Sequence, residues 1–202
     1  MAEIDTGIVD KAVRFAAEKH SGSTRKGTDV PYIVHPMEAA AIMAGITDDQ
    51  ELIAAALLHD TLEDTGATYD DLVSLFGKRV ADLVAAESED KQEEKPAEET
   101  WKVRKQTTID ELKKAGYDSR LLTLADKLSN IRAIERDVKA QGEVFWNRFN
   151  QKDPLMHAWY YMSIAEILES DPKLKDTQAC REYADRVKAV FGYYPKADEN
   201  KD

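Results

Sequence analysis

Apolar residues recur at three- and four-residue spacing along almost the whole chain, and strict alternation over five or more residues is nearly absent. This pattern predicts helices and argues against strands. A first helix running to about His20 is indicated by an apolar stripe at Ile8, Val9, Ala12, Val13 and Ala16. We therefore expect an all-α protein.

Helix start and stop signals divide the pattern further. His35-Pro36 opens a second helix, because proline is tolerated in a first turn. Thr47 to Gln50 has the spacing of a capping box, and the apolar segment Leu52 to Leu58 behind it predicts a buried central helix that ends on His59-Asp60. Later helices are expected from Thr68 to Gly77, through Val80 and Val84, from Trp101 to near Gly116, from a cap at Ser119 through Ile134, from Asp153-Pro154, and around Tyr183, Val187 and Val190.

One segment has no core-forming residues. Glu87 to Glu99 contains seven acidic residues, two lysines and a proline, and no aliphatic side chain larger than alanine. This composition predicts a mobile loop. The loop is too short to link two domains, so we expect a single domain over residues 1–194 and a charged tail over residues 195–202.

The charge balance limits the partners. The chain has 28 Lys and Arg against 39 Asp and Glu, a net charge of −11, so we expect no binding to nucleic acid or to an anionic membrane. Leu52 to Leu58 is the longest apolar run, far short of the ~20 residues that span a bilayer. The acidic opening MAEIDTG lacks the features of a secretory signal, which predicts a cytoplasmic location.

Cys180 is the only cysteine, so an internal disulfide is excluded and a small buried side chain is expected. The oligomeric state stays open.

His59 and Asp60 are adjacent at the end of an otherwise apolar helix. Burying both is costly unless they are paired or ligated, and a His–Asp hydrogen bond that closes the helix end is the simpler alternative. His35 and Asp126 also lie in strongly apolar surroundings, where each is alternatively a satisfied core group or a helix cap. Together the four supply two imidazoles and two carboxylates, a set suited to manganese or ferrous iron.

Other polar side chains lie near these four in the sequence. Glu63 and Asp64 follow the His-Asp pair and are placed to orient or deprotonate a water, or are simply two acids on a solvated turn. Arg25 and Lys26 suit capture of a phosphate, although a solubilising loop has the same composition. Asn130 lies one helical turn after Asp126 and can bond a ribose hydroxyl or a base edge. A second basic cluster is interpreted as an exposed helix face at Lys102, Arg104 and Lys105.

Three segments in order, RKGTDVPYIVHP, LLHDTLEDT and LADKLSNIR, resemble the HD-domain hydrolases of the RelA/SpoT-homologue group, and in particular the stand-alone small alarmone hydrolases. The likeness covers about Val9 to Asp137. It implies an HD-domain helical bundle that hydrolyses the 3′-diphosphate of (p)ppGpp, giving GDP or GTP and pyrophosphate.

The resemblance also implies a role for each matching residue. Manganese, or another divalent transition metal, would be held by His35, His59, Asp60 and Asp126. Glu63 and Asp64 would activate water and assist proton transfer, and the nucleotide would be held by Arg25, Lys26 and Asn130. Two alternatives stay open: the same site acting on ppApp or on the 2′-phosphate of NADPH, and a catalytically silent module that binds alarmone or acts as an antitoxin.

Overall fold

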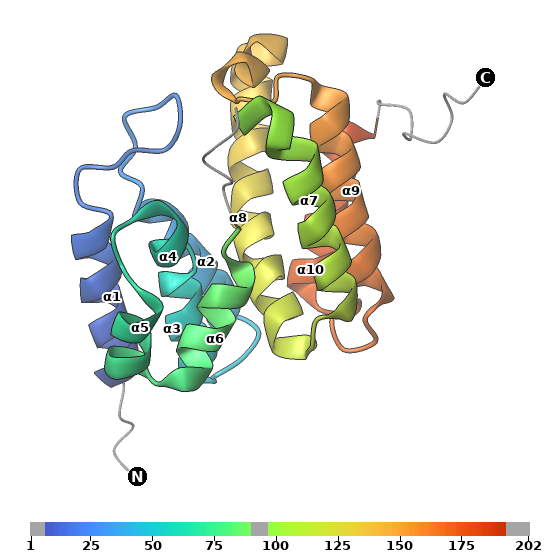
Figure 1. Cartoon of the computed structure of the whole chain (residues 1–202). Coiled ribbons are helices and arrows are strands. Elements are labelled where there is room, and N and C mark those ends of the chain that lie inside the picture. Colours follow the sequence, from blue (N-terminus) through green and yellow to red (C-terminus); the bar gives the residue numbers. More distant parts are fainter. Residues whose placement is uncertain (1–6, 90–96, 193–202) are drawn as a thin grey trace. The chain divides into compact units, whose positions relative to one another are not determined.

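The computed structural model describes residues 7–89 and 97–192 (Figure 1). Helices account for its regular structure, and the one extended pairing among these residues is an isolated bridge between Thr24 and Pro31. The prediction of an all-α protein is confirmed. None of the described helices combines the length and the apolar composition needed to cross a membrane.

The chain divides into two compact units. The first comprises Met1–Ser88 with Leu121–Ser129, and the second comprises Glu89–Arg120 with Asn130–Asp202. The long helix α8, Tyr117–Gln141, therefore contributes its Leu121–Ser129 segment to the first unit. The expectation of a single domain over residues 1–194 stays a prediction.

The first unit is arranged around α3, as its apolar sequence predicts. Ala54, Ala55 and Leu58 in this helix are fully buried, and the helix packs against α1, α2 and α6 (Figure 1). The helices of this unit, besides the segment of α8, are α1 (Gly7–Lys19), α2 (Val34–Ala44), α3 (Gln50–Leu58), α4 (Thr61–Asp64), α5 (Tyr69–Phe76) and α6 (Lys78–Glu87).

Two of the predicted helix boundaries in the first unit have different outcomes. Thr68 and Asp71 form the capping box of α5, and Gly77 ends that helix with a positive φ of 86°. At α3 the predicted cap is wrong, because the side chain of Asp49, not Thr47, accepts from the backbone N–H groups of the first turn. Thr47 instead accepts from the N–H of Asp49, which fixes the capping residue.

The second unit is built on α9, which packs against α7 and α10. Asp153 caps α9 at Pro154 as predicted, whereas Ser119 caps nothing, because α8 already begins at Tyr117. Cys180 is fully buried, as expected. The elements of this unit, besides the remainder of α8, are α7 (Ala97–Lys114), the 3-10 helix η1 (Gly142–Arg148), α9 (Pro154–Ser170) and α10 (Gln178–Phe191).

The prediction of a loop over Glu87 to Glu99 is wrong at both ends of this segment. Glu87 is the last residue of α6 and its side chain is 8% exposed, because Thr123 donates a hydrogen bond to it and Lys127 lies 3.7 Å away. At the other end, Ala97 already begins α7. Residues 90–96 and the predicted tail over residues 195–202 lie outside the described residues.

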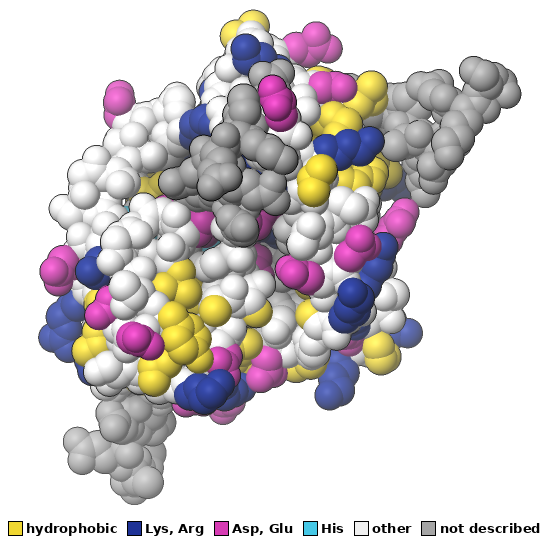
Figure 2. All heavy atoms as spheres, in the orientation of Figure 1, with side chains coloured by type: hydrophobic (Ala, Val, Ile, Leu, Met, Phe, Trp, Pro, Cys, Tyr) yellow, Lys and Arg dark blue, Asp and Glu magenta, His cyan; other side chains and the backbone are white. Residues whose placement is uncertain are grey.

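The prediction that the basic cluster of Lys102, Arg104 and Lys105 on α7 forms an exposed helix face is wrong for two of the three residues. Arg104 and Lys105 are 13% and 19% exposed in their side chains, and both contact the carboxylate of Glu89, at 3.0 and 2.7 Å. Lys102 alone is exposed as predicted. On the face drawn in Figure 2, Lys and Arg side chains lie among Asp and Glu side chains, and no broad basic patch is seen over the described part of the chain.

Candidate metal centre

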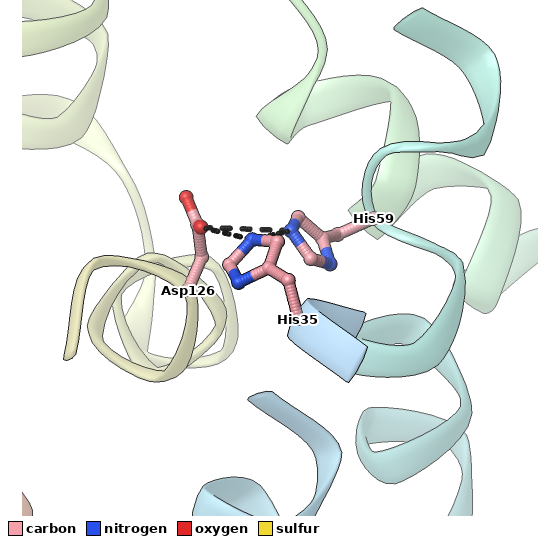
Figure 3. A group of neighbouring side chains, drawn as sticks. All are labelled: His35, His59 and Asp126. Atoms are coloured by element: carbon pink, nitrogen blue, oxygen red, sulfur yellow. Dashed lines mark hydrogen bonds and ion pairs between the residues drawn. The ribbon is translucent and has the colours of Figure 1, made fainter. Parts of the chain in front are cut away.

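Three buried side chains from three helices of the first unit meet at one point (Figure 3). His35 lies in the first turn of α2, His59 is the C-cap of α3, and Asp126 lies in α8. Asp126 Oδ1 is 3.0 Å from His35 Nε2 and 3.5 Å from His59 Nε2, and the two Nε2 atoms are 3.2 Å apart. All three residues are at most 3% exposed.

Asp60 completes the set. Its Oδ2 atom is 3.0 Å from His59 Nε2 and 3.5 Å from His35 Nε2, and its side chain is 19% exposed. The structure thus brings together all four residues that the sequence proposes as ligands, although they are spread over more than ninety positions of the chain.

The spacing of these atoms fits a shared cation. A divalent transition metal binds nitrogen and oxygen donors at about 2.1 Å, which separates neighbouring donors by about 3.0 Å at right angles and about 3.4 Å at tetrahedral angles. The five separations that involve a histidine Nε2 atom lie between 3.0 and 3.5 Å. Two imidazoles and two carboxylates form a mixed donor set that suits a borderline-hard ion.

Hydrogen bonds behind the imidazoles prepare both Nε2 atoms for ligation. His59 Nδ1 lies 2.9 Å from the carbonyl oxygen of Ala56, which can only accept, so Nδ1 carries the proton. His35 Nδ1 lies 2.8 Å from Ser129 Oγ, and the Ser129 hydroxyl donates in turn to Glu38 at 2.7 Å. In the neutral rings the lone pairs of Nε2 therefore face the cluster.

Burial and the two carboxylates act in opposite directions on the histidines. Burial lowers the pKa of His35 below its ordinary value. Burial also acts on His59, but the charge of Asp60 and hydrogen bonds to both carboxylates outweigh it and raise its pKa well above the ordinary value. Burial opposes ionisation of Asp126, whereas the charge of Lys127 and the two imidazoles hold its pKa well below the usual range. A cation held at His59 Nε2 would take the place of the proton on that atom.

A second layer of charge lies behind Asp126. Lys127 Nζ contacts Asp126 Oδ2, the oxygen on the side away from the imidazole contacts, and lies 3.7 Å from Glu87 Oε1. Burial raises the pKa of Glu87 to about 7. Lys127 therefore lies between the carboxylates of Asp126 and Glu87.

The predicted acid–base pair lies one helical turn beyond Asp60. Asp60 is the N-cap of α4, and the N–H of Asp64 donates to its carbonyl oxygen at 2.9 Å. Glu63 is half-buried and Asp64 is exposed. Asp64 Oδ2 accepts a hydrogen bond from Tyr32 at 3.1 Å, and the same hydroxyl donates to Asp60.

The predicted nucleotide-binding residues lie on two elements. Arg25 and Lys26 belong to the loop before α2, and the guanidinium of Arg25 lies 5.5 Å from the ring centre of Tyr32. Asn130 is half-buried and lies four residues after Asp126 in α8. Their part in binding a nucleotide stays a prediction.

Sequence reasoning gave no role to several residues that contact the site. Tyr32, Ser129 and Glu87 are each within one or two contacts of a predicted ligand. Tyr32 lies inside the motif RKGTDVPYIVHP and Ser129 inside LADKLSNIR, so their place in these motifs was the available signal. Glu87 offered none, because its acidic neighbours made it look like part of a loop.

An all-helical unit that brings His35, the His59-Asp60 pair and Asp126 to one point defines a metal-binding domain of the HD class. The HD domain family model matches residues 12–153, and the chain belongs to this family. This confirms the family and the helical bundle expected from the three motifs.

Related proteins agree with that assignment. The guanosine-3′,5′-bis(diphosphate) 3′-pyrophosphohydrolase MESH1 of Danio rerio is 40% identical over 134 residues, which cover 65% of this chain and 71% of that protein. Among solved structures, a Listeria monocytogenes EGD-e protein matches with a TM-score of 0.68 and 32% identity, over 80% of this chain and 96% of its own. A metazoan ortholog of SpoT that hydrolyzes ppGpp matches with a TM-score of 0.68 and 26% identity, over 93% of this chain and 97% of its own.

Proposed function

We propose that this protein is a metal-dependent hydrolase that removes the 3′-diphosphate of (p)ppGpp. Water supplies the oxygen that bonds to the phosphorus next to the ribose, the bond from that phosphorus to the 3′ oxygen breaks, and the products are GDP or GTP and pyrophosphate. The observation that carries the proposal is the convergence of the four donors in a chain that is 40% identical, over 134 residues, to a protein named for this reaction.

Manganese is the proposed ion, and His35, His59, Asp60 and Asp126 would hold it. When bound, the ion supplies Lewis acidity toward water and toward a phosphoryl oxygen. The two imidazoles are already oriented for this task by Ala56 and Ser129, so little reorganisation is needed.

Glu63 and Asp64 are proposed to handle protons. They follow Asp60 within one turn, so their carboxylates lie on the short helix that begins at the metal centre. One carboxylate accepts a proton from the attacking water, and the other, in its acid form, gives a proton to the departing 3′ oxygen of the ribose. Neither is fully buried, so both can reach a bound nucleotide.

Arg25, Lys26 and Asn130 are proposed to bind the nucleotide. A substrate with several phosphate groups is repelled by a chain of net charge −11, so local cations must attract it. Arg25 and Lys26 supply them in the loop before α2, and the amide of Asn130 can bond the ribose. In this proposal the three residues would hold the nucleoside so that its 3′ substituent, not its 5′ substituent, reaches the metal.

A substrate panel tests the proposal. Purified protein, freed of metal and reloaded with manganese, is given ppGpp, ppApp and NADPH, and pyrophosphate, phosphate and nucleoside products are measured. We expect pyrophosphate from ppGpp that depends on the added metal. Faster turnover of ppApp, or release of phosphate from NADPH, would move the assignment to that substrate.

Binding without turnover is the remaining outcome. If ppGpp binds equally to the wild type and to Glu63→Ala and neither releases product, the protein is an alarmone-binding or antitoxin module instead. A parallel series with magnesium, ferrous iron and zinc identifies the metal that supports the highest rate. The cytoplasmic location stays a prediction from the acidic N-terminal segment.

A further inference from the structure

The hydroxyl of Tyr32 lies between a proposed metal ligand and a proposed catalytic acid. It donates to Asp60 Oδ2 at 2.7 Å and to Asp64 Oδ2 at 3.1 Å. A hydroxyl has one hydrogen, so the two carboxylates share a single donor. The Asp60 oxygen that it contacts is the same atom that lies 3.0 Å from His59 Nε2, and it is therefore the oxygen that faces the cation site.

The two acceptors are held in register by the backbone. The N–H of Asp64 donates to the carbonyl oxygen of Asp60 at 2.9 Å, so their side chains project from one turn of α4 toward the same side. Two carboxylates at this spacing repel each other. The shared donor reduces this repulsion and holds both groups toward Tyr32.

The ring of Tyr32 makes a separate set of contacts. It stacks on the imidazole of His20, with ring centres 4.8 Å apart and an angle of 29° between the planes. His20 is 3% exposed, so this contact fixes the ring against the interior. The guanidinium of Arg25 lies 5.5 Å from the ring centre, a distance at which a cation is attracted to an aromatic face.

Tyr32 also lies at the base of the loop that carries the basic residues. Its N–H donates to the carbonyl oxygen of Ser23 at 2.9 Å, and the N–H of Arg25 donates to the carbonyl oxygen of Val30 at 2.8 Å. These bonds close the loop on itself beside the bridge of Thr24 and Pro31. The position of Arg25 is thus tied to the residue that contacts both carboxylates.

We propose that Tyr32 is a positioning residue that joins the nucleotide-binding loop to the metal centre, through two separable parts of one side chain. Its hydroxyl orients the ligating oxygen of Asp60 and the carboxylate of Asp64, and its ring places Arg25. The role of Arg25 and Asp64 in this scheme rests on the proposed function, whereas the effect on the cation site does not.

Two substitutions separate the two parts of the side chain. Tyr32→Phe removes the hydroxyl and keeps the ring, and Tyr32→Leu removes both. For Tyr32→Phe we expect manganese affinity to fall about 3- to 10-fold and kcat to fall about 10-fold or more, with KM for ppGpp within about twofold, since a hydrogen bond to a charged acceptor is lost. Tyr32→Leu should in addition raise KM about fivefold or more, because Arg25 loses its support.

Tyr69→Phe is the matched control. Tyr69 also donates to a carboxylate, that of Asp82 at 2.6 Å, but it is exposed on α5 and has no described contact with the cluster. It should leave manganese affinity, kcat and KM unchanged. Manganese affinity is measured by calorimetry on metal-free protein, and thermal unfolding of each variant shows whether it is folded.

The outcomes separate this inference from the proposed function. If the wild type does not hydrolyse ppGpp, the proposed function is wrong, but the calorimetric comparison of Tyr32→Phe with the wild type still decides whether the hydroxyl supports the cation site. Wild-type manganese affinity in folded Tyr32→Phe overturns the inference. The inference is also overturned if Tyr32→Phe changes both kcat and KM by the same factors as Tyr32→Leu does. If Tyr32→Phe does not fold, a folded Tyr32→Trp, which keeps a ring without the hydroxyl, must show the same loss of affinity.

Discussion

Glu89 and Asp60 are both carboxylates that are largely removed from water, but their partners differ. Glu89, in the second unit, lies 3.0 Å from Arg104 and 2.7 Å from Lys105. Asp60, in the first unit, contacts two imidazoles and a tyrosine hydroxyl, and it has no ion pair with Lys or Arg among the described residues.

Two further carboxylates of the second unit are paired like Glu89. In the second unit Asp171 meets Arg120 at 2.9 Å and Asp137 meets Arg148 at 2.7 Å, so these carboxylates find their counter-charge within the chain. Because burying an unbalanced charge is costly, the chain balances its structural carboxylates itself. In the first unit Lys127 pairs with Asp126, but among the described residues no lysine or arginine pairs with Asp60, and a bound cation would balance that charge.

The largest effect is expected from Asp60→Ala. This substitution removes one of four donors from the proposed metal site, so manganese affinity and hydrolysis of ppGpp should both fall about 1000-fold or more. Metal content of the purified variant, measured beside its rate, checks this. A variant that binds manganese normally would show that Asp60 is not a ligand and that the contrast with Glu89 has another cause.

Glu63→Ala should separate binding of metal from turnover. Glu63 is half-buried on α4 and is not one of the four donors, so the variant should keep its manganese and lose about 100- to 1000-fold in kcat, the contribution of a positioned acid or base. Calorimetry with manganese and steady-state kinetics on one preparation give both values. Loss of metal here would place Glu63 among the ligands, and a normal kcat would remove it from the mechanism.

Glu89→Ala tests the second unit. It leaves Arg104 and Lys105 mostly buried without this partner, so the free energy of unfolding should fall by about 2–3 kcal/mol. Manganese affinity should stay within about twofold of the wild type. Urea unfolding with and without manganese measures both, with Glu89→Gln as the control of similar shape. A loss of metal affinity in this variant would break the distinction between the two kinds of charge.

Glu87→Gln is expected to have the smallest effect, and one that depends on pH. The pKa of Glu87 is raised to about 7, so its contribution to stability is fully present below the ordinary value near 4.5 and is lost as the pH rises through about 7. Metal-free Glu87→Gln should therefore gain about 1–2 kcal/mol over the wild type between pH 5 and pH 8. Urea unfolding of both proteins at pH 5 and pH 8 checks this. The same difference in free energy of unfolding at the two pH values would show that Glu87 does not titrate in this range.

The four proposed ligands could be picked out from the sequence because each of them stands out locally. His35 at a helix start, His59-Asp60 at the end of an apolar helix and Asp126 within an apolar stripe are polar residues in places that favour apolar ones. Their convergence depends on the fold, and the order of the three motifs indicated which fold to expect. Most helix boundaries followed from the same local signals, such as the capping box of Thr68 and Asp71.

What sequence could not supply depends on contacts between distant segments. Glu87 is buried despite its acidic neighbours because Thr123 of α8 donates to its carboxylate and Lys127 of α8 lies 3.7 Å from it. The pairing of Glu89 with Arg104 and Lys105 likewise joins residues 15 and 16 positions apart. Composition alone does not reveal any of these partners.

The most direct measurement of the central claim is anomalous diffraction at the manganese edge from crystals of the wild type soaked in manganese. We predict one strong peak within about 2.2 Å of His35 Nε2, His59 Nε2, Asp60 Oδ2 and Asp126 Oδ1. No peak at full soaking, or a peak elsewhere with the four side chains unchanged, would contradict the account.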